Sequence, residues 1–172
     1  VEKHYVIPIL KKVDNLLSVD NPTKKHVKQL LNSVPSSLIG WGEFFQKLNN
    51  PRWLPLLQGQ GFFKHPPSAV RKGDFIQFPV WPQSGYLVRM AKRTDAKEEV
   101  AKALMDVPLN DNVRVNMDSI DAALELPPDK AAEWVRKKEL KWIKEQDNLY
   151  RLLPKKLAEL ISYLARGGEG DT

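Results

Sequence analysis

The residues of this sequence that could perform hydrolytic chemistry do not form a catalytic pattern. Asp129, Glu139 and Lys141 follow the order of the carboxylates and lysine of some metal-dependent nucleases. Those sites bring two carboxylates to one metal ion from neighbouring strands, whereas the apolar spacing here predicts one continuous helix. Asp129 and Glu139 would then lie about 15 Å apart along the helix axis. We therefore reject a nuclease site.

Other catalytic groups are equally scattered. His4, His26 and His65 do not have the spacing of a zinc-binding HExxH helix, and no GxSxG serine accompanies them. The absence of cysteine removes thiol nucleophiles, disulfides and cysteine zinc sites. No glycine-rich phosphate loop follows a predicted strand. We expect no catalytic residue, no metal site and no cofactor, and thus no enzyme.

Composition predicts a soluble protein that folds as one domain. The chain has 172 residues, of which 42% are hydrophobic and 28% charged, and no apolar run reaches the roughly 18 residues of a membrane span. The lack of cysteine agrees with a reducing cytoplasm. The opening residues include neither an initiator Met nor a signal-peptide pattern, so we expect a segment of a larger cytoplasmic protein.

Positive charge is the main indication of a partner. The net charge is +6 and the isoelectric point is near 9.4, which suits either nucleic acid or an acidic protein surface. Residues 29–93 contain only two acids, Glu43 and Asp74, and also most of the aromatic residues. The candidate binding surface comprises Arg71, Lys72, Arg89, Lys92, Arg93, Lys137, Lys141, Lys144, Lys155 and Lys156. The alternative is an ordinary solvated basic surface.

Apolar residues recur at the i, i+3, i+4, i+7 spacing of amphipathic helices through most of the chain. Asn21-Pro22 and Asn50-Pro51 provide helix starts, while Pro35, Pro108 and the pair Pro127-Pro128 mark helix ends. The predicted helices are 4–19, 22–33, 37–48, 51–58, 82–93, 96–106, 112–125, 129–146 and 154–166.

Three segments share a helical pattern that ends in proline. They are KHVKQLLNSVP at 25–35, EEVAKALMDVP at 98–108 and DSIDAALELP at 118–127. The last two are about 20 residues apart, the pitch of one helix and turn in a solenoid. On this ground residues 82–166 resemble HEAT and armadillo repeats, which implies a protein-interaction scaffold. An irregular helical bundle would have the same elements.

Residues 61–81 predict a long connection between helices that is rich in aromatic residues and proline. Its apolar content argues against disorder, so we expect a packed loop with Phe75, Phe78 and Trp81 in the core. A short strand around DFIQF would have to lie at a sheet edge because Pro79 follows it. The other interpretations are a surface that stacks the bases of single-stranded nucleic acid, with Arg71 and Lys72, and a protein-binding groove.

The sequence therefore predicts an all-α domain, either an irregular bundle or a short HEAT-like solenoid with an aromatic and Pro-rich loop. Its parts are N-terminal helices in 1–60, the packed loop 61–81, HEAT-like helices in 82–166 and a disordered tail at 167–172. We expect a noncatalytic scaffold that binds a protein partner or further domains of its own chain, with no membrane contact. The alternative is a nucleic-acid-binding helical module.

Overall fold

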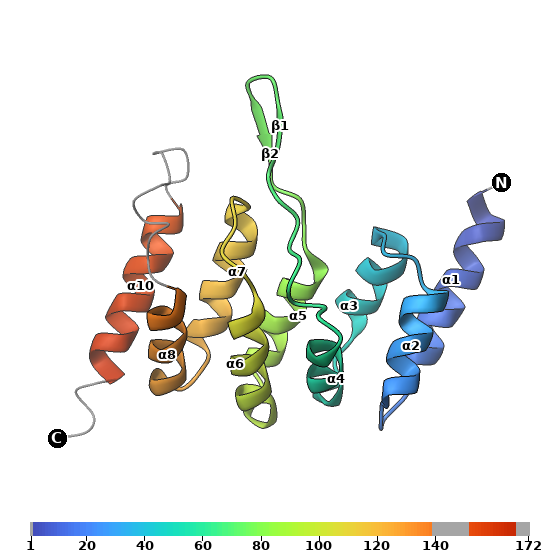
Figure 1. The fold of residues 1–172 in the computed structure, drawn as a ribbon, viewed down its shortest axis with the longest axis horizontal. Helices are drawn as coiled ribbons and strands as arrows, with labels where there is room; N and C mark the ends of the chain where they lie inside the picture. Colours follow the sequence, from blue (N-terminus) through green and yellow to red (C-terminus); the bar gives the residue numbers. More distant parts are fainter. Residues whose placement is uncertain (1, 139–151, 168–172) are drawn as a thin grey trace.

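A computed structural model describes residues 2–138 and 152–167, and these residues form an all-α architecture with one small β-hairpin (Figure 1). The predicted fold class is confirmed. No helix within these residues is long and apolar enough to cross a membrane. Of the predicted helix 129–146, only the part up to Lys138 lies within the described residues.

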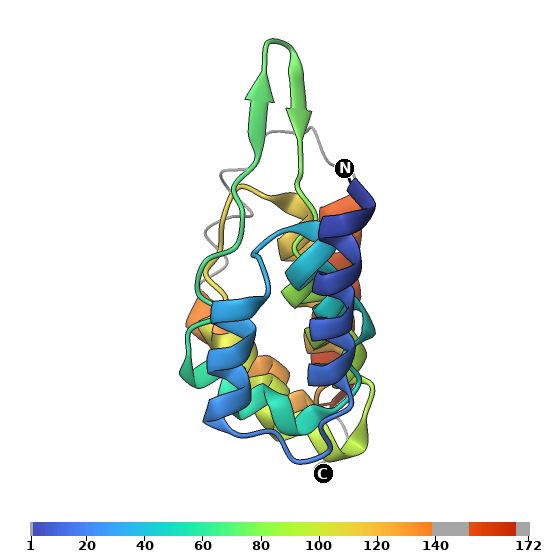
Figure 2. The same ribbon diagram turned by 90° about the vertical axis from the view of Figure 1, so that its right-hand side faces the viewer.

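The helices alternate along the chain between two layers (Figure 2). The first layer consists of α1 (Glu2–Leu17), α3 (Glu43–Lys47), α5 (Pro82–Ala91), α7 (Val113–Leu124) and α10 (Leu152–Gly167). The second consists of α2 (Lys24–Ser33), α4 (Leu54–Gly59), α6 (Lys97–Asp106) and α8 (Pro128–Lys138). Every helix contacts the next one in its own layer. Stacked pairs of this kind fit the predicted bundle or short solenoid, and the relation to HEAT repeats stays a prediction.

Short helical turns and one hairpin complete the described elements. They are the π-helical turn η1 (Leu38–Gly42), the 3-10 turns η2 (Pro51–Trp53) and η3 (Thr94–Ala96), and the strands β1 (Val70–Lys72) and β2 (Phe75–Gln77). The predicted start at Asn50-Pro51 is confirmed, because the Asn50 side chain accepts a hydrogen bond from the Arg52 backbone N–H at 3.0 Å.

The predicted start of α2 at Asn21-Pro22 is wrong by two residues. Thr23 is the N-cap, and the Nδ1 of His26 accepts a hydrogen bond from the Thr23 backbone N–H at 3.0 Å. This hydrogen bond satisfies a backbone donor at the start of the helix, as in a capping box. His26 is thus a capping histidine.

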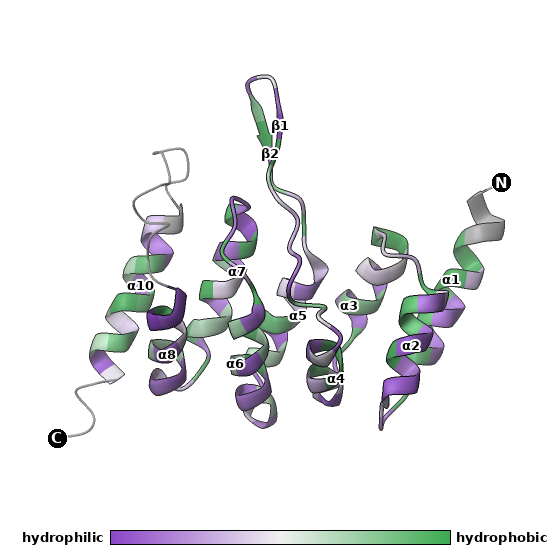
Figure 3. Ribbon diagram, viewed as in Figure 1, coloured by the Kyte–Doolittle hydropathy of each residue, from purple (hydrophilic) through white to green (hydrophobic). Residues whose placement is uncertain are grey.

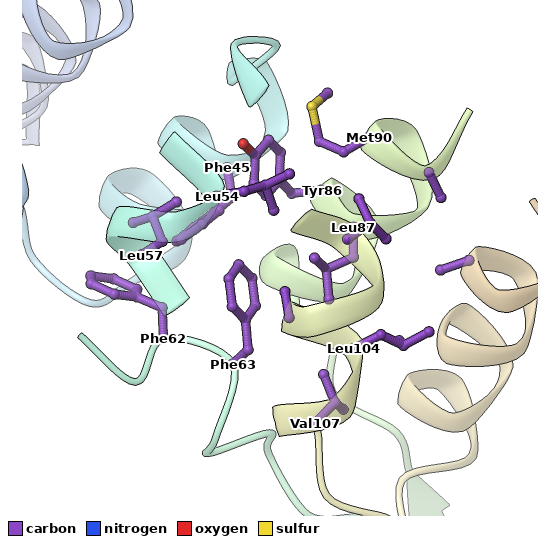
Figure 4. Packing of buried hydrophobic residues seen from close by; sticks show 14 of the residues in the cluster. Phe45, Leu54, Leu57, Phe62, Phe63, Tyr86, Leu87, Met90, Leu104 and Val107 are labelled. Carbon is purple, nitrogen blue, oxygen red and sulfur yellow. The ribbon is translucent and has the colours of Figure 1, made fainter. Parts of the chain in front are cut away.

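The core lies between the two layers and is richest in aromatic rings where α3, α4 and α5 meet. Phe45 packs against Phe62 and Tyr86, with ring centroids 5.8 and 5.9 Å apart. Phe44 meets Trp53 edge to face at 5.1 Å. Figure 4 shows Phe45, Phe62 and Tyr86 in one cluster with Leu87 from α5 and Leu104 from α6.

The expectation that the whole loop 61–81 packs into the core is wrong for its middle. Phe62, Phe63 and Trp81, at the two ends of the loop, are buried, and Phe78 is half-buried against the core. Phe75 is 81% exposed, so its predicted place in the core is incorrect. The physical reason is that β1 and β2 pair with each other, which lifts this ribbon away from the helices.

The predicted tail 167–172 is wrong at its first residue, which belongs to a helix. Gly167 is the last residue of α10, and a Cβ at this position would come within 2.6 Å of the Pro128 side chain. Glycine here permits the close approach of α10 to the start of α8. Residues 168–172 lie outside the described part of the chain.

Candidate functional site

The hairpin between α4 and α5 departs most from the two-layer architecture, since it projects beyond the ends of the helices (Figures 1 and 2). β1 and β2 are antiparallel, and Lys72 lies opposite Phe75 across a two-residue turn. Gly73 opens that turn with a φ of 57°, a left-handed conformation that glycine adopts without steric penalty. A local glycine turn therefore specifies the hairpin.

The side chains of the hairpin divide between its two faces. The pairs Val70–Gln77 and Lys72–Phe75 share one face, because side chains alternate along a strand, and the pair Arg71–Ile76 occupies the other. Phe75 and Val70 are 81% and 39% exposed, and Arg71 and Lys72 are exposed beside them. The hairpin thus presents an aromatic ring and two cations to solvent.

A buried asparagine holds the two legs of the hairpin together at their base. Asn112 is fully buried, and its amide donates hydrogen bonds to the carbonyl oxygens of Pro67 at 3.0 Å and Pro79 at 2.9 Å. Pro67 precedes β1 and Pro79 follows β2, so one side chain joins both legs. We call Asn110, Asp111 and Asn112 the clamp.

The other two clamp residues reinforce the first leg. Asn110 donates to the Pro67 carbonyl at 3.1 Å, and the Asp111 carboxylate accepts from the Ala69 backbone N–H at 2.9 Å. Asn112 also accepts from the Arg114 backbone N–H at 3.1 Å, so the clamp residue is the N-cap of α7. The direction of the hairpin is therefore tied to the start of a core helix.

A groove of about 640 Å³ lies beside the base of the hairpin and crosses the first layer. Its walls come from α1, η1, α3, α5 and α7 and from the end of the loop. Leu38, Ile39 and Val80 line it and are 71%, 46% and 54% exposed, unusually high fractions for large apolar side chains. The groove is thus an open apolar surface rather than a closed cavity.

Four charged residues line the groove, and three of them are already engaged. Asp118 accepts a hydrogen bond from the Ser84 hydroxyl at 2.5 Å, and burial raises the pKa of its carboxyl. Glu43 pairs with Lys47 at 3.1 Å. The Arg89 guanidinium donates to the backbone carbonyls of Phe45 and of two further residues.

Arg114 is the fourth. It is exposed in the first turn of α7, and within the described ranges no ion pair of its side chain closer than 4.0 Å is found. A cation in a first turn is opposed by the helix dipole. The charge of Arg114 acts on Asp118 and lowers the pKa of that carboxyl in part, and its exposed guanidinium at the groove can also receive a carboxylate from outside.

The structure separates the cations predicted for one binding surface. Arg71 and Lys72 lie on the hairpin, whereas Arg89 caps the end of α3, and burial lowers the pKa of its guanidinium. Arg93 forms a bidentate pair with Asp95 at 2.9 and 3.0 Å. Lys92 is exposed at the end of α5.

The described C-terminal cations of the set lie on two different helices. Lys137 is exposed on α8, and Lys155 is exposed on α10. Lys156 pairs with Asp121 at 2.6 Å. Lys141 and Lys144 lie outside the described residues. Of the described members of the predicted set, Arg71 and Lys72 are the two that lie on the hairpin, where Lys72 shares a face with the exposed Phe75 and Arg71 lies on the opposite face.

None of the described residues that were candidates for catalysis in the sequence lines the groove. His65 is exposed, and the side chain of His4 lies outside the described part. The residues that the structure describes contain no cluster of three or more metal-ligating side chains. Asp129 is exposed in the first turn of α8, while Glu139 and Lys141 lie outside the description.

Sequence reasoning missed the clamp and the groove. The polar run Asn110-Asp111-Asn112 between two predicted helices was visible, but its pairing with a loop more than 30 residues away was not. The groove joins residues from four helices and two connections, a grouping with no local signal.

Comparison with models of protein families, with curated proteins and with solved structures found no match to this chain.

Proposed function

We propose that this chain is a noncatalytic interaction module that binds a partner protein through the hairpin and the groove at its base. One observation carries the proposal: a fully buried asparagine fixes the direction of a hairpin whose Phe75 is 81% exposed. Long structured connections in compact domains are commonly functional. The proposal includes two predictions from the sequence, namely that the helices resemble HEAT repeats and that the protein is cytoplasmic.

Energetics support a binding role for the hairpin. An isolated two-stranded hairpin is only marginally stable in water, and this one has no third strand among the described residues. An exposed Phe contributes little to folding, whereas burying its ring against a partner contributes about 2–3 kcal/mol. The clamp reduces the conformational entropy that binding would otherwise remove.

A second candidate function is binding of single-stranded nucleic acid. Arg71 and Lys72 could contact phosphates while Phe75 stacks on a base, because all three are exposed on one short ribbon. The other cations of the set that the structure describes lie outside the hairpin, and Arg89, Arg93 and Lys156 have partners within the protein. We therefore favour a protein partner.

Photo-crosslinking in cells tests the proposed function. A photoreactive amino acid at position 75 should form an adduct with one defined protein. The same amino acid at position 161 is the matched control, because Ile161 is also a large, exposed apolar residue and lies on α10, away from the hairpin. Absence of an adduct at position 75, or equal adducts at both positions, would contradict the proposal.

Oligonucleotide binding tests the second candidate. A labelled single-stranded oligonucleotide should bind the wild-type chain at low salt, lose affinity as salt rises, and bind Phe75→Ala more weakly. No binding at about 50 mM salt removes nucleic acid as a candidate.

A further inference from the structure

We infer that the outer edge of β2 and the adjoining groove receive one extended, acidic segment of the partner protein, which adds to the hairpin as a third strand. This inference rests on the proposed function and specifies the chemistry of the partner. Two grounds concern the hairpin: its edges differ in charge, and the backbone groups of Ile76 point outward. The other two are the apolar groove at its base and the excess of positive charge around it.

The two edges of the hairpin differ in their protection against strand pairing. β1 contains Arg71 and Lys72, and charged residues on an edge strand discourage the addition of another chain. β2 consists of Phe75, Ile76 and Gln77, none of which is charged, and Figure 3 shows it as hydrophobic. The described sheet contains only β1 and β2, so the uncharged edge of β2 has no strand partner there.

The register indicates which backbone groups of β2 point outward. Antiparallel residue pairs alternate between hydrogen-bonded and non-hydrogen-bonded types, and the pair that flanks a two-residue turn is of the bonded type. Lys72–Phe75 is that flanking pair, so the next pair, Arg71–Ile76, is non-bonded. The N–H and C=O of Ile76 therefore point away from β1 and are available to an incoming strand.

The apolar surface continues from the hairpin into the groove. Val80 follows β2 by three residues and lines the groove together with Leu38 and Ile39 of η1. Eight large hydrophobic residues are exposed in the described part of the chain, and five of them lie on the hairpin or the groove. These five are Leu38, Ile39, Val70, Phe75 and Val80. A strand on the edge of β2 can thus extend its apolar side chains toward the groove.

Positive charge identifies the segment as acidic. The hairpin and the groove carry an excess of positive charge, because Arg71, Lys72, Arg89 and Arg114 outnumber the acids Asp74 and Asp118. Asp118 accepts its hydrogen bond from the neutral Ser84 hydroxyl, and Glu43 is paired with Lys47. A second copy of this chain would bring together cations from molecules that each carry a net charge of +6. Nucleic acid would match the cations but leave the apolar groove unfilled.

Selection from a display library of random linear peptides against the whole chain tests the inference. The enriched peptides should alternate apolar residues with Asp or Glu, as an edge strand with one apolar face requires. A synthetic peptide from the selection should bind Ile76→Pro about tenfold more weakly, because proline removes the outward N–H without touching the ladder to β1. Fluorescence polarisation measures the affinities.

Matched variants separate the backbone contact from other effects. Ile76→Val retains the N–H and should bind nearly as well as wild type. Arg114→Glu should weaken binding of the acidic peptide, and Arg114→Lys should largely restore it. Methylation of individual backbone nitrogens of the peptide should weaken binding at every second position, a readout that does not depend on the folding of any variant.

Several outcomes would overturn the inference. The selection could enrich no peptide, or it could enrich basic peptides. The selected peptide could bind Ile76→Pro and Ile76→Val with equal affinity. An oligonucleotide could displace the bound peptide as strongly as unlabelled peptide does. A concentration-dependent dimer through the hairpin in sedimentation would also overturn it. If crosslinks to a protein at position 75 persist while Ile76→Pro has no effect, the proposed function stands and the added strand is excluded.

Discussion

At the scale of single residues, the side chains with the most specific roles are polar ones that satisfy backbone groups. Asn112 donates hydrogen bonds to carbonyl groups on both legs of the hairpin and is the N-cap of α7. Arg89 likewise donates a hydrogen bond to the backbone carbonyl of Phe45 in α3. A buried carbonyl without a donor costs about 1–3 kcal/mol. These residues therefore determine how the loop and the helices meet.

We expect Asn112→Ala to lower the free energy of unfolding by about 2–4 kcal/mol, because it leaves the carbonyls of Pro67 and Pro79 without their amide donor and removes an N-cap. Chemical denaturation measures this value. Asn112→Asp keeps the cap acceptor but not the donor, so it should also be destabilising. Alanine at the exposed Asn49 is the control, and an equal effect there would contradict the role of the clamp.

Asp118 gives a prediction about pH. Burial raises the pKa of its carboxyl above the ordinary 3.8, and the hydrogen bond from Ser84 opposes that rise only in part. The folded state therefore holds this proton more tightly than the unfolded state. The stabilisation linked to it is fully present below the unfolded-state pKa and is lost as pH rises through the folded-state pKa.

Asp118→Asn should therefore raise the free energy of unfolding at neutral pH, and the difference from wild type should shrink as pH falls through the folded-state pKa toward 3.8. Denaturant titrations across the pH range measure both curves. The control is Asp129→Asn, which alters an exposed acid in the first turn of α8 and should not be stabilising. A constant difference between Asp118→Asn and wild type at all pH values would disprove the assignment.

At the scale of elements, the loop between α4 and α5 has two ends that fold with the helices and a middle that does not. Phe62, Phe63 and Trp81 anchor the ends in the core, while β1 and β2 pair with each other above it. The same segment thus supplies both core and exposed surface. Stability and binding should be separable by mutation within it.

Alanine replacements on either side of this division should behave differently. Phe63→Ala should lower the free energy of unfolding by about 3–5 kcal/mol, because it leaves a cavity at a fully buried position. Phe75→Ala should change it by less than about 0.5 kcal/mol. Thermal and denaturant unfolding of both variants measure the contrast. A similar loss for Phe75→Ala would mean that the hairpin packs against the protein in solution.

At the scale of the whole molecule, the two layers form a row in which each helix contacts mainly its neighbours. α5 and α7 lie in the middle of the first layer and have helices on both sides, whereas α1 and α10 end the described row (Figure 1). Stability in such a row depends on interfaces between neighbours. The central helices should therefore open less often than the outer ones.

Hydrogen–deuterium exchange followed by mass spectrometry should show this gradient. We expect the slowest exchange in α5 and α7, faster exchange in α1 and α10, and the fastest in the hairpin, whose strands are short and exposed. The exchange rates of peptides from the buried central helices serve as the reference for the rates of the outer helices and the hairpin. Uniform protection along the chain would indicate one cooperative unit instead.

The sequence by itself determined the local structure of this protein. Apolar spacing and proline punctuation located the helices, since both act within a few residues of chain. The same local rules predicted a short strand near Phe75 and excluded known catalytic motifs. Composition, however, predicted burial for Phe75, because it records how apolar a segment is and not which segments pair.

Only the tertiary structure decided the candidate site. Its contacts connect residues that are distant in the sequence. Asn112 hydrogen-bonds to Pro67 and Pro79, and Arg89 hydrogen-bonds to a carbonyl of α3. Leu38 and Val80 line the same groove. Such contacts depend on how the two layers of helices place their ends side by side. That placement results from packing of the whole core, whose energy is shared among many side chains and leaves no signal at any one position.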